Sequence, residues 1–378
     1  MAASNLVPGR RVEKHAEPGI QAIAFSGPSH QEWHLSATLP EGQSRKDLFG
    51  RVASWLRRTG VRIVSQEVFG LPYRAGAGLQ EITAAFGEIT WPVTWVENRD
   101  ETAAPLCGMQ VWGVSGLPVE PVMLEGAVLG SLFEDEGARY CRLGGLAPGE
   151  TTRSPEDQTR AVFEQMDAAL SAVDMGFEHV VRTWFFNRDI LAWYGGFNAV
   201  RDRFFQEKQV FDGLMPASTG VGGRVPLGAA LVAGLLAVKG KRQAVRAVAA
   251  PSPLQCPAKD YGSSFSRAVE VVTPGTRRLF ISGTASIAPE GRTVHAGDAG
   301  AQVALTLDVV RAILESRGMG WNDVTRTVAY FKHVPDAPVF ARLCAARGMP
   351  VLPAVVMNED ICREDLLFEI ELDAIRPY

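Results

Sequence analysis

The sequence is poor in cysteine and histidine, and neither residue forms a recognisable metal-binding pattern. Five cysteines in 378 residues are an odd number, with no CxxC pair and no histidine at the spacing of a zinc site. A disulfide framework is therefore disfavoured, and reduced thiols in a cytoplasmic protein are expected. The six histidines are scattered along the chain, so we expect no metal site.

The sequence also gives no indication of a signal peptide, a membrane span or an excess of basic residues. The first residues, MAASNLVPGRRVEKHAEPG, contain no apolar h-region. The longest apolar run, GAALVAGLLAV, is too short to cross a bilayer and suits a buried strand. The formal net charge of −4 lacks the basic excess that is typical of nucleic-acid or anionic-membrane binding. We therefore expect a cytoplasmic protein without nucleic-acid or membrane partners, in which local arginines would hold any anionic ligand.

The composition is that of an ordinary globular protein, with 46% hydrophobic and 21% charged residues. A length of 378 residues is long for one hydrophobic core. Two or three structural units are therefore expected.

The second and third parts of the chain contain an internal repeat. The letters MGF, V and RT at 175–183 recur as MGW, V and RT at 319–327, so that Met175 and Met319 lie 144 residues apart. A helical pattern precedes each copy, QTRAVFEQMDAALSAVDMG in the first and AQVALTLDVVRAILESRGMG in the second, with apolar residues at i, i+3 and i+4. Strand-like openings, RYCRLGGLAP and RLFISGTASIAP, come before these helices.

Each copy predicts the element order β, α, β, α, β, closed by the apolar strand GAALVAGLLAV or DLLFEIELDAI. The predicted fold class is α/β, with tandem α+β units that carry helices on one face of each sheet. The expected units are 136–245 and 246–378, and we interpret 1–135 as a degenerate first unit, although no matching motif is found there. The Pro- and Ser-containing stretch KGKRQAVRAVAAPSPLQCPAKDYGSSFSRA is typical of a connector.

The last strand raises a question, because it places Glu369 between Phe368 and Ile370. Alternation puts Phe368, Ile370 and Leu372 on one face and Leu367, Glu369 and Glu371 on the other. A buried, ionised carboxylate is costly unless it is paired, so Glu369 lies either on an open face or in a functional site. Glu371 fits a solvated position better.

The repeat units resemble the Rid (YjgF) family, whose small α/β subunits form trimers with ligand sites at subunit interfaces. The resemblance rests on SFSRA, LFISGTASIAP, MGWNDVTRTVAYFKHV, LPAVV and LFEIELDAI, which cover nearly all of 263–376. It implies a ligand-facing aromatic at Phe265, a backbone ligand site at Ser282 and Gly283, and a water-positioning glutamate at Glu369. The arginine that the Rid deaminases carry after "PA" is replaced by Val355, and by Ser218 in the other copy, which argues against an imine deaminase.

Most of the chain resembles a narrower family, the chorismatases. The matching stretches are WPVTWVE, VWGVSG, RYCRLGGL, RTWFF, WYGGFN, MPASTGVGG, LQCPAKDYGSSFSRAVEV, SGTASI and CREDLLFEIELDA. The resemblance implies a single chain that folds like a Rid trimer fused end to end, with one working site and no cofactor. It also implies chorismate as the substrate, action in secondary-metabolite biosynthesis, and a chain that functions as a monomer.

The resemblance assigns roles to two residues near the C-terminus. Chorismate carries pyruvate as an enol ether, and cleavage begins with protonation of the enol methylene carbon. Burial against apolar neighbours would keep Glu369 protonated near neutral pH, so Glu369 is interpreted as the general acid. Its alternatives are an exposed strand position or a partner for an arginine. Cys362, seven residues earlier, marks the branch that makes 3-hydroxybenzoate, whereas a free cysteine is otherwise a small core residue.

The substrate would also need cations. On the predicted helix LAWYGGFNAVRDRFF, Tyr194, Asn198 and Arg201 lie at i, i+4 and i+7 on one face, where Arg201 could bind a carboxylate. An arginine that is merely solvated is the competing interpretation. The other copy lacks this set and the first copy lacks the glutamate, so we expect one composite site at their junction. Arg142, Arg224 and Arg267 are further candidates.

The sequence therefore favours a chorismatase that releases pyruvate and 3-hydroxybenzoate. One alternative is a hydrolytic chorismatase that forms 3,4-dihydroxycyclohexa-1,5-diene carboxylate. The other is a non-catalytic Rid-like module that binds a small metabolite.

Overall fold

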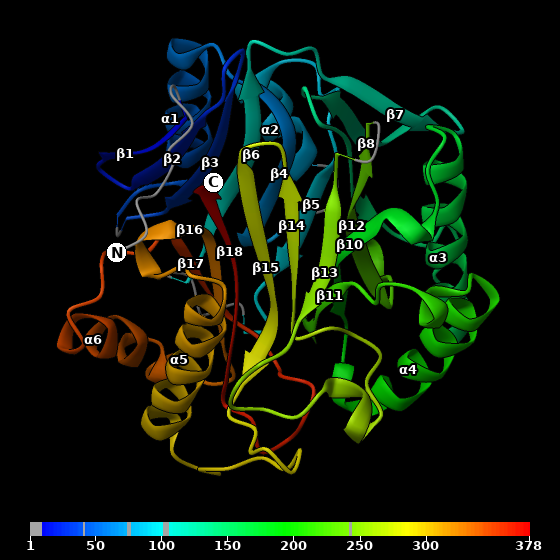
Figure 1. Cartoon of the computed structure of the whole chain (residues 1–378), viewed down its shortest axis with the longest axis vertical. Helices are drawn as coiled ribbons and strands as arrows, with labels where there is room; N and C mark the ends of the chain where they lie inside the picture. The colour runs from blue at the N-terminus through cyan, green and yellow to red at the C-terminus, as the bar shows by residue number, and fades with distance from the viewer. Residues whose placement is uncertain (1–9, 41, 74–76, 101–105, 242–243) are drawn as a thin grey trace.

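The computed structural model describes residues 10–40, 42–73, 77–100, 106–241 and 244–378, and these form three six-stranded sheets with helices outside them (Figure 1). The first unit contains β1 Arg11–Glu17, β2 Ile20–Ser26, β3 Gln31–Thr38, α1 Arg45–Thr59, β4 Arg62–Gly70, α2 Ala77–Phe86, β5 Val93–Glu97 and β6 Gly108–Ser115. The second contains β7 Glu120–Leu124, β8 Ala127–Glu134, β9 Ala138–Leu146, α3 Pro155–Ser171, β10 Val180–Asn187, α4 Ile190–Glu207, β11 Ala217–Gly222 and β12 Leu231–Gly240. The third contains β13 Arg246–Ala250, β14 Ala268–Thr273, β15 Thr276–Ala285, α5 Ala299–Ser316, β16 Val324–Phe331, α6 Pro338–Ala346, β17 Ala354–Asn358 and β18 Phe368–Pro377.

The three sheets share one topology. Their strand orders are β1-β2-β3-β6-β4-β5, β7-β8-β9-β12-β10-β11 and β13-β14-β15-β18-β16-β17, with one parallel pair at the end of each. The predicted tandem units are therefore confirmed, and the first unit has the same strand order although its sequence lacks the repeat motif. The five-element prediction missed the hairpin that opens each sheet. The second sheet includes β7 and β8, and its first strand in the chain begins at Glu120.

The repeat motif marks the same structural junction in both copies. Met175 and Met319 follow the helices α3 and α5, and each is succeeded by a short 3-10 turn that leads into β10 or β16. Both strands begin with an irregularity in the register, just before Arg182 in one and Arg326 in the other. A bulge redirects the side chains that follow it. Arg182 and Arg326 are consequently buried in the interior.

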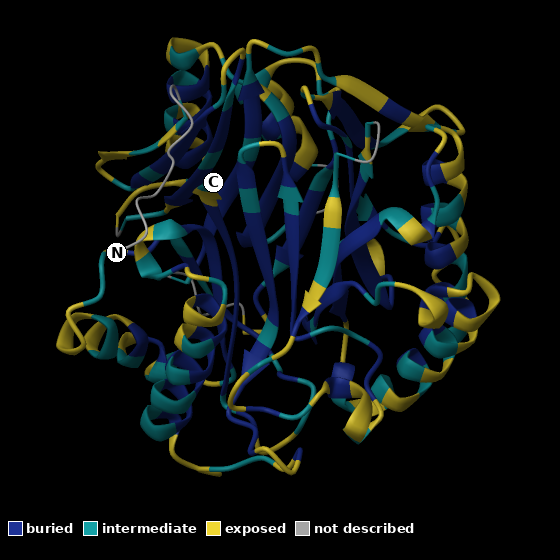
Figure 2. Ribbon diagram, in the orientation of Figure 1, coloured by how far each residue is buried: buried dark blue, intermediate teal, exposed yellow. Residues whose placement is uncertain are grey.

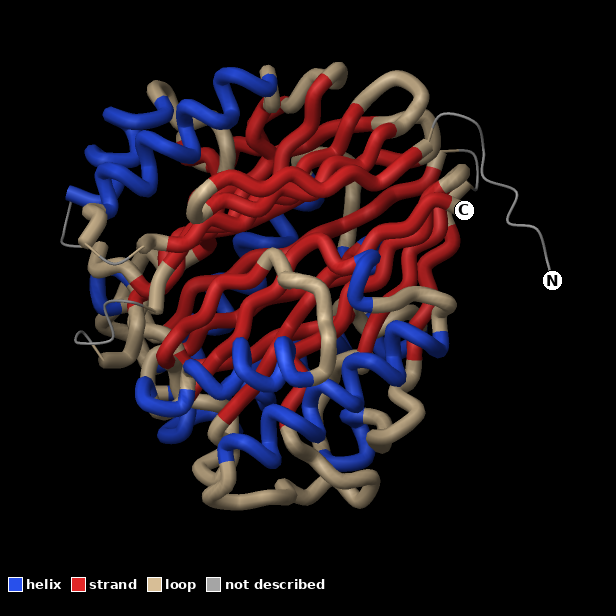
Figure 3. Tube along the Cα trace, turned by 90° about the vertical axis from the view of Figure 1, so that its left-hand side faces the viewer, coloured by secondary structure: helices blue, strands red, loops and turns tan. Residues whose placement is uncertain are grey.

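Each unit buries its helices against one face of its sheet. Helix α3, for example, places Val162, Phe163, Met166, Ala169 and Leu170 in the core at the spacing that the sequence predicted. The helices' outer faces are exposed, whereas the strands between them are almost wholly buried (Figure 2). The tube view shows the same layering, with helices outside the stacked strands (Figure 3). None of the helices in the described ranges is long and apolar enough to cross a bilayer.

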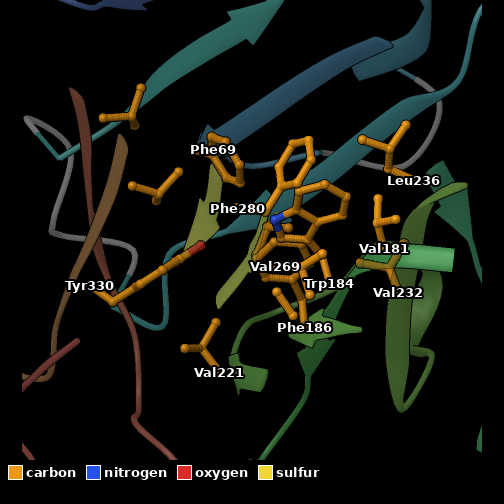
Figure 4. Close-up of a cluster of buried hydrophobic side chains, with 14 of the residues drawn as sticks. Phe69, Val181, Trp184, Phe186, Val221, Val232, Leu236, Val269, Phe280 and Tyr330 are labelled. Atoms are coloured by element: carbon orange, nitrogen blue, oxygen red, sulfur yellow. The ribbon is translucent and has the colours of Figure 1, made fainter. Parts of the chain in front are cut away.

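A fourth core lies where the inner faces of the three sheets meet. It contains Phe69 from the first unit, Trp184 and Phe186 from the second, and Phe280 and Tyr330 from the third (Figure 4). The contacts between sheets run in one direction around the molecule: β5 packs on β9 and β12, β11 on β15, and β17 on β3 and β6. The three units therefore close into a ring, as a trimer of separate subunits would.

One buried ion pair crosses each of the three junctions. Arg142 of the second unit pairs with Glu67 of the first at 2.8 Å. Arg278 of the third unit pairs with Glu32 of the first, and Arg182 of the second pairs with Glu371 of the third. All six side chains are at most 6% exposed. Buried charges of this kind are tolerated because their partners are present, and here each partner is supplied by a neighbouring unit.

Glu371 is therefore not solvated, contrary to the expectation from its strand. Its carboxylate accepts hydrogen bonds from Arg182 and Thr219 and pairs with Arg326 at 2.8 Å, and none of its surface is exposed. Alternation correctly put it on the face opposite Phe368 and Ile370, but that face is covered by the neighbouring unit.

We predict that Glu371→Ala lowers the free energy of unfolding by roughly 3–5 kcal/mol, because Arg182 and Arg326 then lose their shared carboxylate inside the protein. Urea denaturation followed by circular dichroism measures the change. Glu17→Ala is the matched control, since it breaks an exposed ion pair with Arg58 and should cost less than about 1 kcal/mol. Equal losses in the two variants would contradict the assignment of Glu371 as the central acceptor.

Candidate active site

A cleft of about 250 Å³ lies between the second and third units, where β11 packs on β15. Helix α4 forms one wall, β11 and β15 form the floor, and two loops of the third unit complete it, the loop before β14 and the loop between β17 and β18. The floor is held together by Ser282, whose hydroxyl accepts from the Ser218 backbone N–H at 2.9 Å and donates to the Ser266 carbonyl. The cleft is thus positioned by hydrogen bonds that cross the junction.

Eight of the residues proposed from the sequence line this cleft. They are Tyr194, Asn198, Arg201, Phe265, Arg267, Gly283, Cys362 and Glu369. The structure therefore brings together the polar face of α4 from one repeat and the glutamate of the other, 168 residues away along the chain from Arg201. Their chemical roles stay predictions, but their convergence on one cleft is observed.

Glu369 is held by its strand at the bottom of the cleft. Its backbone pairs with Ala285 on one side and Tyr330 on the other, and the residue is 5% exposed. The carboxyl group lies directly over Gly283, where a Cβ atom would be 2.0 Å from Glu369 Oε1. A glycine is needed at this position because any side chain would displace the carboxyl group.

The surroundings of Glu369 favour its protonated form. Burial raises the pKa of Glu369 to about 8, and the negative charge of Glu371 acts in the same direction. The charges of Arg182 and Arg267 oppose this shift without cancelling it. Glu371 lies two residues further along the same strand face, and there the charges of Arg326 and Arg182 hold its pKa below the usual value in spite of burial. Two neighbouring carboxyl groups therefore differ in protonation at neutral pH.

Two arginines of the cleft are buried without a carboxylate partner among the residues that the structure describes. Arg201 is 2% exposed; its Nη2 donates to Asn198 Oδ1 at 2.9 Å, and its Nε has no acceptor. Arg267 is 4% exposed; its Nε donates to the Cys256 carbonyl at 3.0 Å, and its Nη2 has no acceptor. Buried guanidinium groups normally face anions. The cleft is therefore arranged to receive a negatively charged ligand.

Cys362 lies in the loop between β17 and β18, where it lines the cleft. Burial raises the pKa of its thiol to about 12, and the nearby Glu369 adds to the shift. The thiol is consequently protonated at neutral pH, which argues against a nucleophilic role for Cys362.

The lining residues that the sequence analysis did not propose include Tyr261 and Arg363. Tyr261 belongs to the stretch that was interpreted as a connector, which in fact contains β13 and a lining loop. Arg267 and Arg363 both have their guanidinium carbons 5.2 Å from the centre of the Tyr261 ring. Tyr261 thus helps to position two cations. Arg363 directly follows Cys362 in the sequence, and this position could have indicated that Arg363 also lines the cleft.

Three proposed residues lie elsewhere. Arg142 is at the junction of the first and second units, where Glu67 occupies its guanidinium group. Arg224 lies at the same junction, with its Nη2 3.9 Å from a Glu97 oxygen. Ser282 is fully buried beneath the cleft, where its hydroxyl joins β11 to β15. Arg142 and Arg224 therefore do not line this cleft. The hydroxyl of Ser282 has a structural role beneath it.

Comparisons with known proteins agree with this architecture. The family described as endoribonuclease L-PSP matches residues 144–230 and 261–376, which lie in the second and third units. A chorismatase of Streptomyces hygroscopicus is 29% identical over 265 residues, which are 63% of this chain and 74% of that protein. A 3-hydroxybenzoate synthase of the same organism is 27% identical over 269 residues, 64% of this chain and 75% of that protein.

Among solved structures, a crystal structure of a chorismatase covers 91% of this chain and 98% of its own, with a TM-score of 0.65 and 21% sequence identity. This likeness extends over all three units, including the first, which the family match does not reach. The tandem three-unit fold is therefore shared with that protein.

Proposed function

Because this chain belongs to the endoribonuclease L-PSP family and, within it, to the chorismatase family, we propose that it is a chorismatase, which cleaves the enol ether of chorismate and releases pyruvate. One observation carries the proposal: a carboxyl group that favours its neutral form shares a buried cleft with two guanidinium groups that lack carboxylate partners. Chorismate is a dianion whose cleavage needs a proton on carbon. The two guanidinium groups can bind the two carboxylates of chorismate, and the neutral carboxyl group can supply the proton.

The arginines bind and orient the substrate in this proposal. Arg201 approaches the cleft from α4 and Arg267 from the loop before β14, so the two cations lie on different elements and can each receive one carboxylate. A charge-assisted hydrogen bond to a carboxylate is roughly twice as strong as a neutral one. Tyr194, whose pKa is raised by burial, stays a hydroxyl donor at neutral pH.

Glu369 supplies the proton. Its O–H bond breaks as the new C–H bond forms at the enol methylene, and the electron pair stays on Glu369 as a carboxylate. The positive charges of Arg267 and Arg182 favour that carboxylate as it forms. Water alone is a poor acid for carbon at neutral pH, whereas a carboxylic acid with a pKa near the working pH is well suited to this task.

Two routes can follow protonation, and they give different products. In the first, the neighbouring ring hydroxyl displaces pyruvate within the molecule, and isomerisation of the ring gives 3-hydroxybenzoate with no net use of water. In the second, water adds to the protonated enol ether and pyruvate leaves, which gives the non-aromatic dihydroxy acid. We favour 3-hydroxybenzoate because Cys362 lines the cleft beside Glu369, and a neutral thiol there occupies space that a water molecule would need.

The hydrolytic route is the second candidate function, and the half-buried position of Cys362 is compatible with it. Incubation with chorismate separates the alternatives. Mass spectrometry and ultraviolet spectra identify an aromatic acid, a dihydroxy acid or unchanged chorismate. Unchanged chorismate would contradict the proposed function and favour a non-catalytic binding protein.

We predict that Glu369→Gln lowers the rate of pyruvate release by about a hundred- to ten-thousandfold, because the amide cannot donate the proton. Pyruvate is measured with a coupled lactate dehydrogenase assay. Glu364→Gln is the control, since this carboxylate is 80% exposed in the loop before β18 and should leave the rate unchanged.

The pH dependence tests the same residue. Because the protonated form of Glu369 is the active one, kcat/KM should be level below about pH 8 and fall tenfold per pH unit above it. A carboxyl group of ordinary pKa would lose activity already above about pH 5. A profile that declines between pH 5 and 7 would contradict the raised pKa that keeps Glu369 protonated at neutral pH.

We predict that Arg201→Ala raises KM for chorismate at least tenfold, since a charge-assisted contact to a carboxylate contributes roughly 1.5–3 kcal/mol. Steady-state kinetics measure the effect. Arg203→Ala is the matched control, because Arg203 lies on the same helix with its side chain exposed. An unaltered KM in the Arg201 variant would mean that the substrate does not reach this guanidinium group.

We predict that Cys362→Ala still releases pyruvate but shifts the product from 3-hydroxybenzoate toward the dihydroxy acid. Loss of the sulfur leaves space for a water molecule, which then competes with the ring hydroxyl. Liquid chromatography gives the product ratio, and Cys344→Ala, on the remote helix α6, is the control. An unchanged product ratio at the normal rate of pyruvate release would mean that Cys362 only packs in the core and does not influence the product.

A further inference from the structure

A second cleft, of about 450 Å³, lies between the first and second units, where β5 packs on β9 and β12. Its size falls within the range of small-molecule sites. Helix α2 contributes Leu79 and Ile82, and β5 contributes Val93 and Trp95. The proposed function makes no use of this cleft.

The second cleft is built from the same elements as the candidate active site, one unit earlier in the chain. Its lining residues Val225, Pro226, Ala229 and Val232 each lie 137 residues before Cys362, Arg363, Leu366 and Glu369. Helix α2 stands where α4 does, β5 where β11 does, and the end of β9 where the end of β15 does. Four matched positions on three matched walls identify the two clefts as counterparts.

The chemistry of the second cleft is the opposite of the first. Val232 occupies the position of Glu369, and Pro226 that of Arg363. Among the described residues that line it, none is an aspartate, glutamate, lysine, arginine or histidine. Tyr73 and Thr151 are its polar side chains. An ion that entered would lose its hydration without gaining a partner, so a charged ligand is disfavoured.

The mouth of the cleft exposes large apolar side chains. Leu227 is 76% exposed and Leu79 is 49% exposed. Leu227 also has a backbone φ of 61°, a left-handed conformation that is strained for a leucine. Strained residues of this kind cluster at ligand clamps and similar sites, and exposed apolar groups at a cleft gain from contact with an apolar ligand.

The interior suits a flat ring. Trp95 is 4% exposed, and its indole N–H donates to the Leu71 carbonyl at 2.6 Å, so the ring rather than the polar atom is available. The ring of Tyr73 meets that of Trp95 edge to face, with centroids 5.3 Å apart. Gly145, Ala147 and Pro148, which have short or compact side chains, also line the cleft. Aromatic ligands gain from edge and face contacts with such rings.

We propose that the cleft between the first and second units is a second binding site, which takes an uncharged aromatic molecule. This second site rests on the proposed function in one respect, that the cleft between the second and third units binds a ligand. It does not require that the protein turns over chorismate. The ligand is recognised by its flat apolar body and its lack of charge. Leu227 and Leu79 cover it at the mouth, and Val232 contacts it at the position of the glutamate.

Isothermal titration calorimetry of the full chain with indole tests the site, and indole-3-carboxylate serves as the charged probe with the same ring. We expect indole to bind, and the carboxylate to bind the second cleft at least tenfold more weakly. Leu227→Asn should weaken indole binding about three- to tenfold, because asparagine tolerates the left-handed backbone but lacks the apolar side chain. Val232→Glu should weaken it more than tenfold.

The candidate active site supplies the control. Arg201→Ala should leave indole binding unchanged, and saturating chorismate should not displace indole. The proposal is overturned by absence of indole binding, by binding that Leu227→Asn leaves unchanged, or by binding that Arg201→Ala weakens. Leu227 is exposed, so its variant remains informative even if Val232→Glu fails to fold. Pyruvate release from chorismate, measured on the same samples, reports the proposed function separately.

Discussion

The buried ion pairs between the units are the interaction on which the rest of the structure depends. Arg142 with Glu67, Arg182 with Glu371 and Arg278 with Glu32 each join two different units. A guanidinium group removed from water without its carboxylate is unfavourable by several kcal/mol, so each unit is complete only when it is docked on its neighbours. Arg182 lies on β10 beside β11, and Glu371 lies on β18 beside β15, so this pair joins the two sheets where β11 packs on β15 and the cleft lies. Stability and site geometry thus have one origin.

The same strand shows how partners decide the chemistry of a residue. Glu369 and Glu371 are both buried on one face of β18. Two arginines and a threonine surround Glu371, which stays ionised, whereas Glu369 lacks a close cation and favours its proton. The arginines divide in the same way: Arg182 and Arg326 pair with Glu371 inside the protein, whereas Arg201 and Arg267 line the cleft without a carboxylate partner among the described residues. Burial alone would not distinguish a structural charge from a functional one.

Local sequence patterns predicted the helices, the repeated units and the faces of the strands, because these features depend on residues that are near in sequence. The repeat revealed two units, the helical spacing predicted α3 and α5, and alternation predicted the face on which Glu369 lies. Alternation could not show that a neighbouring unit covers that face, so the burial of Glu371 was missed. The partner of Arg142 lies 75 residues away in the sequence, and no local signal links it to Glu67. Tyr261 was missed because its Pro- and Ser-containing surroundings suggested a linker.

A single chain permits what identical subunits cannot, because each junction evolves its own side chains on a shared backbone. Among the residues that the structure describes, the polar face of α4 meets Glu369 at the junction between the second and third units. At the first junction Val232 takes the place of the glutamate, and at the third the side chain of Val355 packs on Gly108. Each buried arginine without a partner destabilises the fold, so three copies of the charged cleft would multiply that cost. Confining the unpaired arginines to one junction keeps the ligand site, while Arg142 and Arg278 at the other two junctions each have a glutamate partner.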